Sequence, residues 1–460
     1  MIGIVRRNRL FLWVIVVVII GFTNCRAKNQ NDITVMLMNE KQISFSDKNH
    51  SLDNNDNFSS DIRFICYDTR GTIFNDNIGN SKTIEKIEIS TGIETILYHP
   101  ESVTGEQAAP GVGAVSWHPS EDKVIFIHGP DLKEVEERGY YGITNRTGVE
   151  VSTDGKQIIT RVDLRDVSTD RPTIHGAQRG GTHRHEYSRN GRRIGFTYDD
   201  FLNSDYDRTI AYLEPSVNAP VGYSHYFAVI LKPSKKGKSR PGEIEKAYGD
   251  SWVDSTGTMR AFVGKVRAEN GEDYQTDLFV ADIPENVDIT TSFSGNIKEY
   301  PEPPTGIKIR RLTHSGKVEG NVRGSFNGDW IAYLSPDDSE VRQIFVIDSH
   351  SSDIQSNNSH KPQQLSKFSS DASAPRWHPK KNWLFTVLDG NIAAICAEKG
   401  PNFGKTFLLT SDKQKRSELV VSPDGNTLAY SILKAYNGEN ESREFRQIFV
   451  LEFDLDEILE

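Results

Sequence analysis

Two histidines one residue apart, His183 and His185, have the spacing in this chain that most readily suggests chemistry. Alternate residues of an extended strand point to the same side, so these two imidazoles could share one divalent metal ion, such as manganese or zinc. Glu186, or a histidine from elsewhere in the chain, could complete the ligand shell. The alternative is that both imidazoles cap strand ends and bond to the backbone, and the sequence leaves both possibilities open.

Other histidines could supply a base beside such a metal. His128 and His225 follow or begin short apolar runs that have the pattern of strands, so each is expected near a strand end. An imidazole that reaches a bound substrate there could take up a proton. We therefore select His128 and His225 as candidate catalytic residues.

Several arginines could bind an acidic substrate. A guanidinium group holds a carboxylate through two parallel hydrogen bonds, and Arg70, Arg179 and Arg323 are the candidates for this role. Arg184 and Arg376 belong to the same cationic set. The chain also contains 64 acidic residues, so the competing interpretation for any one arginine is an ion pair between structural units.

A repeated turn motif predicts the strands that hold these histidines and arginines in place. A phrase rich in Ser, Pro, Asp, Asn and Gly, followed by a short apolar strand, recurs seven times. Asp and Asn cap their own backbone, and Gly allows the chain to reverse into a hairpin. The last two copies are separated by roughly 40–45 residues, which is the length of a four-stranded propeller blade. The copies begin at Ser59, His118, Ser188, Asp254, Ser325, His378 and Ser422.

The two ends of the chain complement each other. The seventh repeat reaches its third strand and then stops near Glu460, whereas residues 41–45 have the pattern of a fourth strand. Closure of a ring in this way removes the open sheet edges. We predict an all-β fold over residues 40–460, a seven-bladed β-propeller closed by an N-terminal strand that completes the last blade. Two packed β-sandwich domains are the competing fold.

The first residues have a different character from the rest. An arginine-rich start precedes a short apolar run at 10–22, which is typical of a secretory signal peptide over residues 1–27. Cleavage after Ala27, lipidation of Cys25 and retention as an anchor are alternatives. Residues 28–39 are expected to be a flexible linker. The sequence thus predicts an exported, periplasmic protein that meets the membrane only through its N-terminal segment.

Composition narrows the class of partner. The formal net charge is −10 and no long basic block is present, which argues against nucleic acid. Cys66 and Cys396 lie in apolar strand-like runs and are expected to be buried thiols. Long helical patterns are scarce, and the one short helix expected in an insertion covers 243–248.

Several segments resemble one bacterial family of propellers, namely 67–70, 126–130, 179–188, 196–200 and 224–226. Through them the chain resembles the YidR-like family of TolB-type, WD40-like propellers over nearly all of the predicted ring. The resemblance implies a propeller in a bacterial envelope setting and no established activity. More distantly, the architecture is similar to oligogalacturonate lyase, a seven-bladed propeller that uses histidines to hold a divalent metal.

Two classes of function are consistent with these features. The first is a non-catalytic propeller of the cell envelope that binds a glycan or another protein. The second is a metal-assisted lyase acting on acidic, uronate oligosaccharides. In that reaction a metal or arginine neutralises the carboxylate, and a histidine removes the neighbouring proton.

Overall fold

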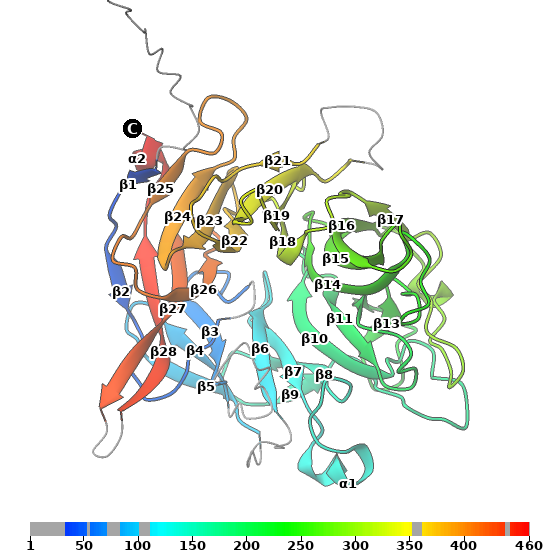
Figure 1. The fold of residues 1–460 in the computed structure, drawn as a ribbon. Coiled ribbons are helices and arrows are strands. Elements are labelled where there is room, and N and C mark those ends of the chain that lie inside the picture. Colours follow the sequence, from blue (N-terminus) through cyan, green and yellow to red (C-terminus); the bar gives the residue numbers. More distant parts are fainter. Residues whose placement is uncertain are drawn as a thin grey trace, which may run out of the picture. The chain divides into compact units, whose positions relative to one another are not determined.

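The computed structural model describes residues 33–52, 56–70, 83–100, 111–351, 361–437 and 442–459. Seven antiparallel sheets follow one another around a ring (Figure 1). This arrangement confirms the predicted all-β, seven-bladed propeller. The proposed signal segment and Cys25 lie outside the described residues. Among the residues described, no helix is both long and apolar enough to cross a membrane.

The first three blades come in chain order. Blade 1 consists of β3 (Phe64–Asp68), β4 (Ile84–Glu88) and β5 (Glu94–Tyr98). Isolated bridges from Ser51 to Asp68 and from Phe58 to Ile65 place these two residues beside β3, on the inner side of this blade. Blade 2 consists of β6 (Val112–Trp117), β7 (Lys123–His128), β8 (Thr147–Ser152) and β9 (Ile159–Arg161). Blade 3 consists of β10 (Gly180–Tyr187), β11 (Ile194–Asp200), β12 (Thr209–Pro215) and β13 (His225–Val229).

The next two blades have the same order of strands from the centre outward. Blade 4 consists of β14 (Ile244–Trp252), β15 (Met259–Arg267), β16 (Tyr274–Asp282) and β17 (Lys308–Arg311). Blade 5 consists of β18 (Glu319–Gly324), β19 (Trp330–Pro336), β20 (Arg342–Asp348) and β21 (Gln363–Gln364). The helix predicted over 243–248 is wrong, because these residues enter β14. Pairing of β14 with β15 outweighs the local helix preference of Glu, Lys and Ala.

The last two blades include strands from the N-terminal part of the chain. Blade 6 consists of β22 (Ala372–Trp377), β23 (Trp383–Leu388), β24 (Asn391–Cys396), β25 (Thr406–Leu408) and β1 (Ile33–Val35). Blade 7 consists of β26 (Arg416–Val421), β27 (Thr427–Asn437), β28 (Ser442–Glu452) and β2 (Glu40–Gln42). The helices are short: two 3₁₀ turns, Leu132–Glu134 and Ile289–Thr291, and α1 (Val135–Arg138) and α2 (Leu455–Leu459).

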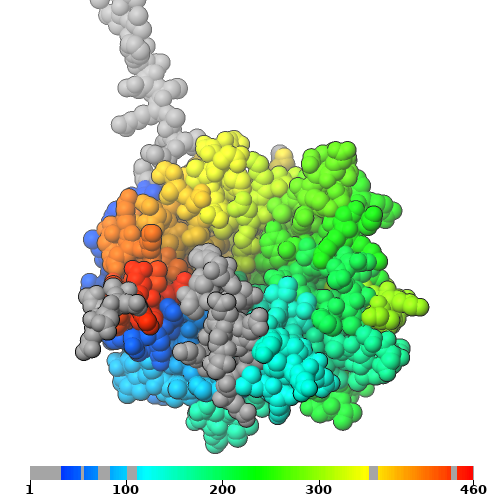
Figure 2. All heavy atoms as spheres, turned by 60° about the horizontal axis from the view of Figure 1, so that its bottom comes forward, coloured from blue at the N-terminus to red at the C-terminus, as the bar shows by residue number. Residues whose placement is uncertain are grey.

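The N-terminal strand closes the ring as predicted. β2 pairs antiparallel with β28, with Lys41 opposite Val450, and the amide of Ile43 donates to the carbonyl of Ile448 over 2.9 Å. In Figure 2 the blue N-terminal residues accordingly lie beside the red C-terminal ones. β1 adds a further parallel strand next to β25. A strand therefore occurs inside the stretch 28–39 that we expected to be a flexible linker.

The repeated turn phrase joins the first and second strands of the blades. In blade 7 the Oγ atom of Ser422 accepts a hydrogen bond from the amide of Thr427 over 3.0 Å, and Gly425 takes a positive φ of 89°. Blades 3 and 5 repeat this bond from Ser188 and Ser325. The apolar core then lies between neighbouring blades, and Cys66 and Cys396 are free and buried in it, as expected.

Candidate functional site

A ring of β-bulges surrounds the central channel. The innermost strands of blades 2 to 7 each lose register with the second strand at the same place. A bulge inserts extra residues and changes the direction of the side chains that follow. We refer to these six positions as the bulge ring. Its positive-φ residues are Ala114, Arg184, Gly249, Gly320, Ala374 and Glu418.

The bulge of blade 3 separates the two histidines that were predicted to share a metal. Arg184 has a φ of 58°, and the pairing of β10 with β11 shifts between His183 and Glu186. His183 lines a cavity on the channel wall. His185 is fully buried, with its Nε2 atom 2.9 Å from Thr182 Oγ1 and its ring centroid 5.2 Å from that of Phe196.

The expectation that alternate residues share a side therefore fails at this position. Both imidazoles are neutral near pH 7, since burial and the neighbouring Arg146 hold the pKa of His183 well below its usual range and that of His185 at about 3. In the part of the chain that the structure describes, no group of three or more His, Cys, Asp or Glu side chains is placed to hold a metal ion. The geometry does not support a metal shared by His183 and His185.

The two candidate bases lie away from these histidines. His128 is buried between blades 1 and 2, where its Nδ1 donates to the carbonyl of Gly129 over 2.6 Å and the hydroxyl of Tyr98 donates to Nε2 over 2.9 Å. Burial lowers its pKa to about 4. His225 begins the outermost strand of blade 3, and its Nδ1 lies 2.8 Å from Ser224 Oγ. Neither histidine lines the cavities of the channel described below.

Two of the predicted substrate-binding arginines form ion pairs within or beside their own blades. Arg70 contacts Asp68 through Nε and Nη2, each at 2.7 Å. Arg179 contacts Asp200 at 2.8 Å and also donates to the carbonyl groups of Asn296 and Glu299. Their guanidinium groups are buried and used for structure.

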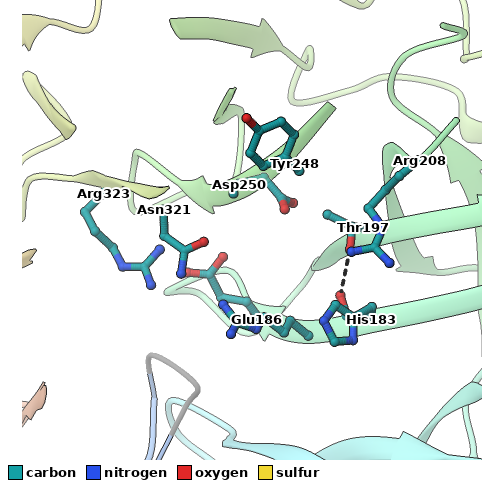
Figure 3. Close-up of a pocket in the computed structure, with 10 residues that line it drawn as sticks. His183, Glu186, Thr197, Arg208, Tyr248, Asp250, Asn321 and Arg323 are labelled. Atoms are coloured by element: carbon teal, nitrogen blue, oxygen red, sulfur yellow. Dashed lines mark hydrogen bonds between the residues drawn. The ribbon is translucent and has the colours of Figure 1, made fainter. Parts of the chain in front are cut away.

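Arg323 differs from these two because it lines both cavities of the channel. The first, the bulge cavity, has a volume of about 240 Å³ and lies between blades 3, 4 and 5. Figure 3 shows Arg323 and Glu186 on one side of it and His183 and Arg208 on the other. The dashed line there is the hydrogen bond from Thr197 Oγ1 to the carbonyl of His183, at 3.4 Å.

The acidic side chains of the bulge cavity already have cationic partners. Glu186 and Asp250 both contact the buried Arg260, at 3.0 and 2.6 Å. Arg208 contacts Asp199 at 2.8 Å. Arg323 forms no such salt bridge among the described residues, and the nearby carboxyl groups of Glu186, Asp56 and Asp250 favour its charged form from a longer distance.

The second cavity, the turn cavity, has a volume of about 260 Å³ and lies where the innermost strands end and the repeated turns begin. Arg323 is a lining residue of this cavity as well as of the bulge cavity. Arg376, which has the same place in blade 6 as Arg323 in blade 5, also lines it. The sequence indicated Arg376 as a member of the cationic set. It did not indicate that Arg376 lies beside Arg323.

The two arginines lie in similar surroundings. Each residue is 7% exposed, and each donates through Nη1 to the carbonyl of the preceding residue, at 2.9 Å for Arg323 and 3.0 Å for Arg376. The Nε atoms of both are buried and have no hydrogen-bond partner among the described residues. Burial and the cations of Arg323 and Arg184 hold the pKa of Arg376 well below its ordinary value.

Comparison with known proteins finds a family model and several solved structures that are similar to this chain. A family described as "Protein of unknown function (DUF3748)" matches residues 111–222, from β6 to the loop after β12. TolB from Acinetobacter baumannii is 11% identical, covers 85% of this chain and 80% of its own, and has a TM-score of 0.37. The propeller domain of the Trilobed protease from Pyrococcus furiosus is 7% identical, covers 88% and 97%, and has a TM-score of 0.48.

A curated relative gives the clearest assignment. The "Uncharacterized protein YidR" of Escherichia coli (strain K12) is 30% identical, and the match covers 85% of this chain and 94% of the relative. The match extends over most of the blades, well beyond the segment around β10. This chain belongs to the YidR family of β-propellers.

Proposed function

We propose that this protein is an exported propeller of the bacterial envelope that binds an acidic oligosaccharide in its central channel. The observation that carries the proposal is the pair Arg323 and Arg376. These two buried guanidinium groups each have an Nε atom without a hydrogen-bond partner among the described residues, and they share the neighbouring carboxyl group of Asp56. Two cations beside one carboxyl group are unfavourable until a further anion reaches them. A carboxylate presented by a ligand supplies that anion and accepts the hydrogen bonds of both guanidinium forks.

The form of the channel supports binding of a chain rather than a single small molecule. The bulge cavity and the turn cavity share Arg323 as a lining residue, and the inner strands of several blades contribute to their walls. Blade strands are rigid, and a preformed cavity lowers the entropic cost of ordering a ligand. An envelope protein is the second partner that we expected from the sequence, and a segment of that protein would have to fit into the same cavities.

The metal-assisted lyase is less well supported. That reaction needs a metal site and a base close to the substrate carboxylate. Of the candidates, His183 lines the channel, while His128, His185 and His225 lie in three other places. Binding without bond cleavage is therefore the function that the geometry favours.

Calorimetric titration of the full chain with oligogalacturonate tests the proposal. We expect saturable binding to one site per molecule, weakened by salt because the contact is between charges, and no binding of a neutral oligosaccharide of the same length. Arg323→Gln is expected to weaken binding at least about tenfold. Arg240→Gln is the matched control, because that side chain is exposed in a loop and pairs with Glu243, its neighbour in the same loop.

Equal binding of the neutral and acidic sugars would overturn the proposal, as would the absence of any binding. The same mixture should be followed for unsaturated uronate products. Their appearance at a rate that depends on protein concentration would establish a lyase and contradict a purely binding role.

A further inference from the structure

The turn cavity has the size of one sugar residue. Its volume of about 260 Å³ corresponds to roughly nine water molecules at ~30 Å³ each. The repeated turns of five blades and the end of β18 in a sixth converge around it, so its outline is set by backbone that the fold holds in place. Their contributions include Ser60, Pro119, Arg189, Gly324, Pro379 and Pro423.

Rings form much of the wall of the turn cavity. Phe58, Trp117, Tyr187 and Trp377 all line it, together with the prolines of three turns. These four aromatic side chains are between 2% and 8% exposed, so their orientations are fixed by packing. A cavity lined by aromatic faces, with a few polar groups that fix orientation, is typical of a site for a small ring-containing ligand.

The polar groups of the turn cavity are few and of two kinds. Arg323 and Arg376 present guanidinium groups whose buried Nε atoms have no partner among the described residues. Asp56 lines the same cavity and can accept hydrogen bonds from hydroxyl groups. An acidic sugar carries both complements, a carboxylate for the arginines and hydroxyls for the aspartate.

We infer that the turn cavity is the subsite for one uronate residue of the oligosaccharide, with its carboxylate between Arg323 and Arg376 and its ring against the aromatic wall. This inference rests on the proposed function and adds the place and the chemistry of recognition. Because Arg323 also lines the bulge cavity, the rest of the oligosaccharide continues from the turn cavity past this side chain. A carboxylate without a ring, or a ring without a carboxylate, fills only half of the subsite.

Single sugars test this inference separately from the oligosaccharide. Galacturonate and glucuronate are the probes, with galactose and glucose as neutral controls and acetate as a carboxylate without a ring. Trp117 and Trp377 line the cavity, so binding is expected to change the intrinsic tryptophan fluorescence of the full chain. We expect this change with the two uronates and not with the three controls.

Two variants at Arg376 give the decisive comparison. Arg376→Gln is expected to weaken uronate binding at least about tenfold, and Arg376→Lys to restore only part of it, because an ammonium group keeps the charge and loses the fork. Arg240→Gln is again the control. Circular dichroism and the unfolding midpoint identify any variant that fails to fold. If Arg376→Gln does not fold, the binding measured for Arg376→Lys is used to test the role of this residue.

The outcomes separate this inference from the proposed function. If oligogalacturonate binds and both Arg376 variants keep the affinity and fluorescence of the parent protein, the uronate subsite is wrong while the proposed function stands. If acetate or galactose binds as tightly as galacturonate, the cavity does not require both the sugar ring and the carboxylate, and the proposed subsite is also wrong. If no acidic sugar binds at all, both proposals fail.

Discussion

The indole Nε1 of Trp377 donates a hydrogen bond of 2.9 Å to the backbone carbonyl of Arg323 in the preceding blade. The same bond recurs between blades 3 and 4, where Trp252 Nε1 donates to the carbonyl of Glu186 over 3.0 Å. In both cases a tryptophan at the end of an inner strand fixes the backbone of a charged residue beside the channel. The position of Arg323 therefore depends on its neighbouring blade.

Replacement of Trp377 by Phe tests this dependence. The variant loses the hydrogen bond and part of the indole packing, so we expect the free energy of unfolding to fall by about 1–3 kcal/mol. We also expect weaker uronate binding, because the carbonyl and backbone of Arg323 lose their restraint. Urea denaturation and calorimetric titration give the two values.

Trp252→Phe is the matched control for this experiment. It removes the equivalent bond, but Trp252 does not itself line the turn cavity and does not bond to Arg323, so the variant should lower stability by a similar amount and change uronate affinity less than Trp377→Phe does. A Trp377→Phe variant that binds uronate as tightly as the parent protein would contradict the positioning role.

Uronate affinity is expected to depend on pH through Asp56. Burial and the neighbouring Glu186 raise the pKa of this carboxyl group to about 7, although Arg189, Arg323 and Arg376 act in the opposite direction. Below this pKa Asp56 is neutral and does not compete for the arginines. Above it, the carboxylate repels the uronate, which is ionised throughout this range. Affinity should therefore fall roughly tenfold from about pH 6 to about pH 8.

The substitution Asp56→Asn should flatten this profile, since the amide cannot ionise. Titrations of the parent protein and the variant across the same pH range make the comparison. A parallel decline in both proteins would show that another group is responsible.

Closure of the ring depends on Glu40 in β2. Its carboxylate contacts Nη2 of the buried Arg416 at 2.9 Å and accepts a hydrogen bond of 2.7 Å from the hydroxyl of Tyr430. Glu40→Gln removes the charge and is expected to lower the free energy of unfolding by about 1–3 kcal/mol. Lys41→Ala, at an exposed position of the same strand, should have little effect. Equal urea midpoints for Glu40→Gln and the parent protein would refute this role.

The two histidines of blade 3 are expected to respond differently to truncation. His185 is fully buried beside Phe196, so His185→Ala should lower the free energy of unfolding by about 2–4 kcal/mol through the space it leaves. His183 borders the channel, and His183→Ala should cost less than about 1 kcal/mol. Thermal unfolding of both variants measures the difference, and similar losses would argue against the bulge at Arg184.

The fold could be predicted because its signals are local and repeated. Each turn copy, such as the one that begins at Ser422, carries its own hydrogen-bonding group and its own glycine. The complementary patterns of β2 and β28 then indicated how the ring closes. These features depend on short stretches of sequence and not on the arrangement of distant blades.

The site could be predicted only in part, because the bulges leave little trace in the sequence. A positive φ usually indicates glycine, yet Arg184, Ala114 and Glu418 take this conformation in the bulge ring. The spacing of His183 and His185 therefore suggested a shared side that the backbone does not provide. Among the arginines, Arg70 and Arg179 look no different in sequence from Arg323, and only the contacts between blades separate those used for structure from those that line the channel.

The bulge ring also has a consequence for how proteins of this family can diverge. Six blades repeat the same backbone geometry, and the residues at its positive-φ position are glycine in two blades, alanine in two, and arginine and glutamate in one each. Since the bulge tolerates such different residues, the chemistry of the channel can change one blade at a time while the hydrogen-bonded sheets behind it stay intact. Single substitutions in the bulge ring can therefore change the ligand specificity of the channel while the scaffold of the propeller stays the same.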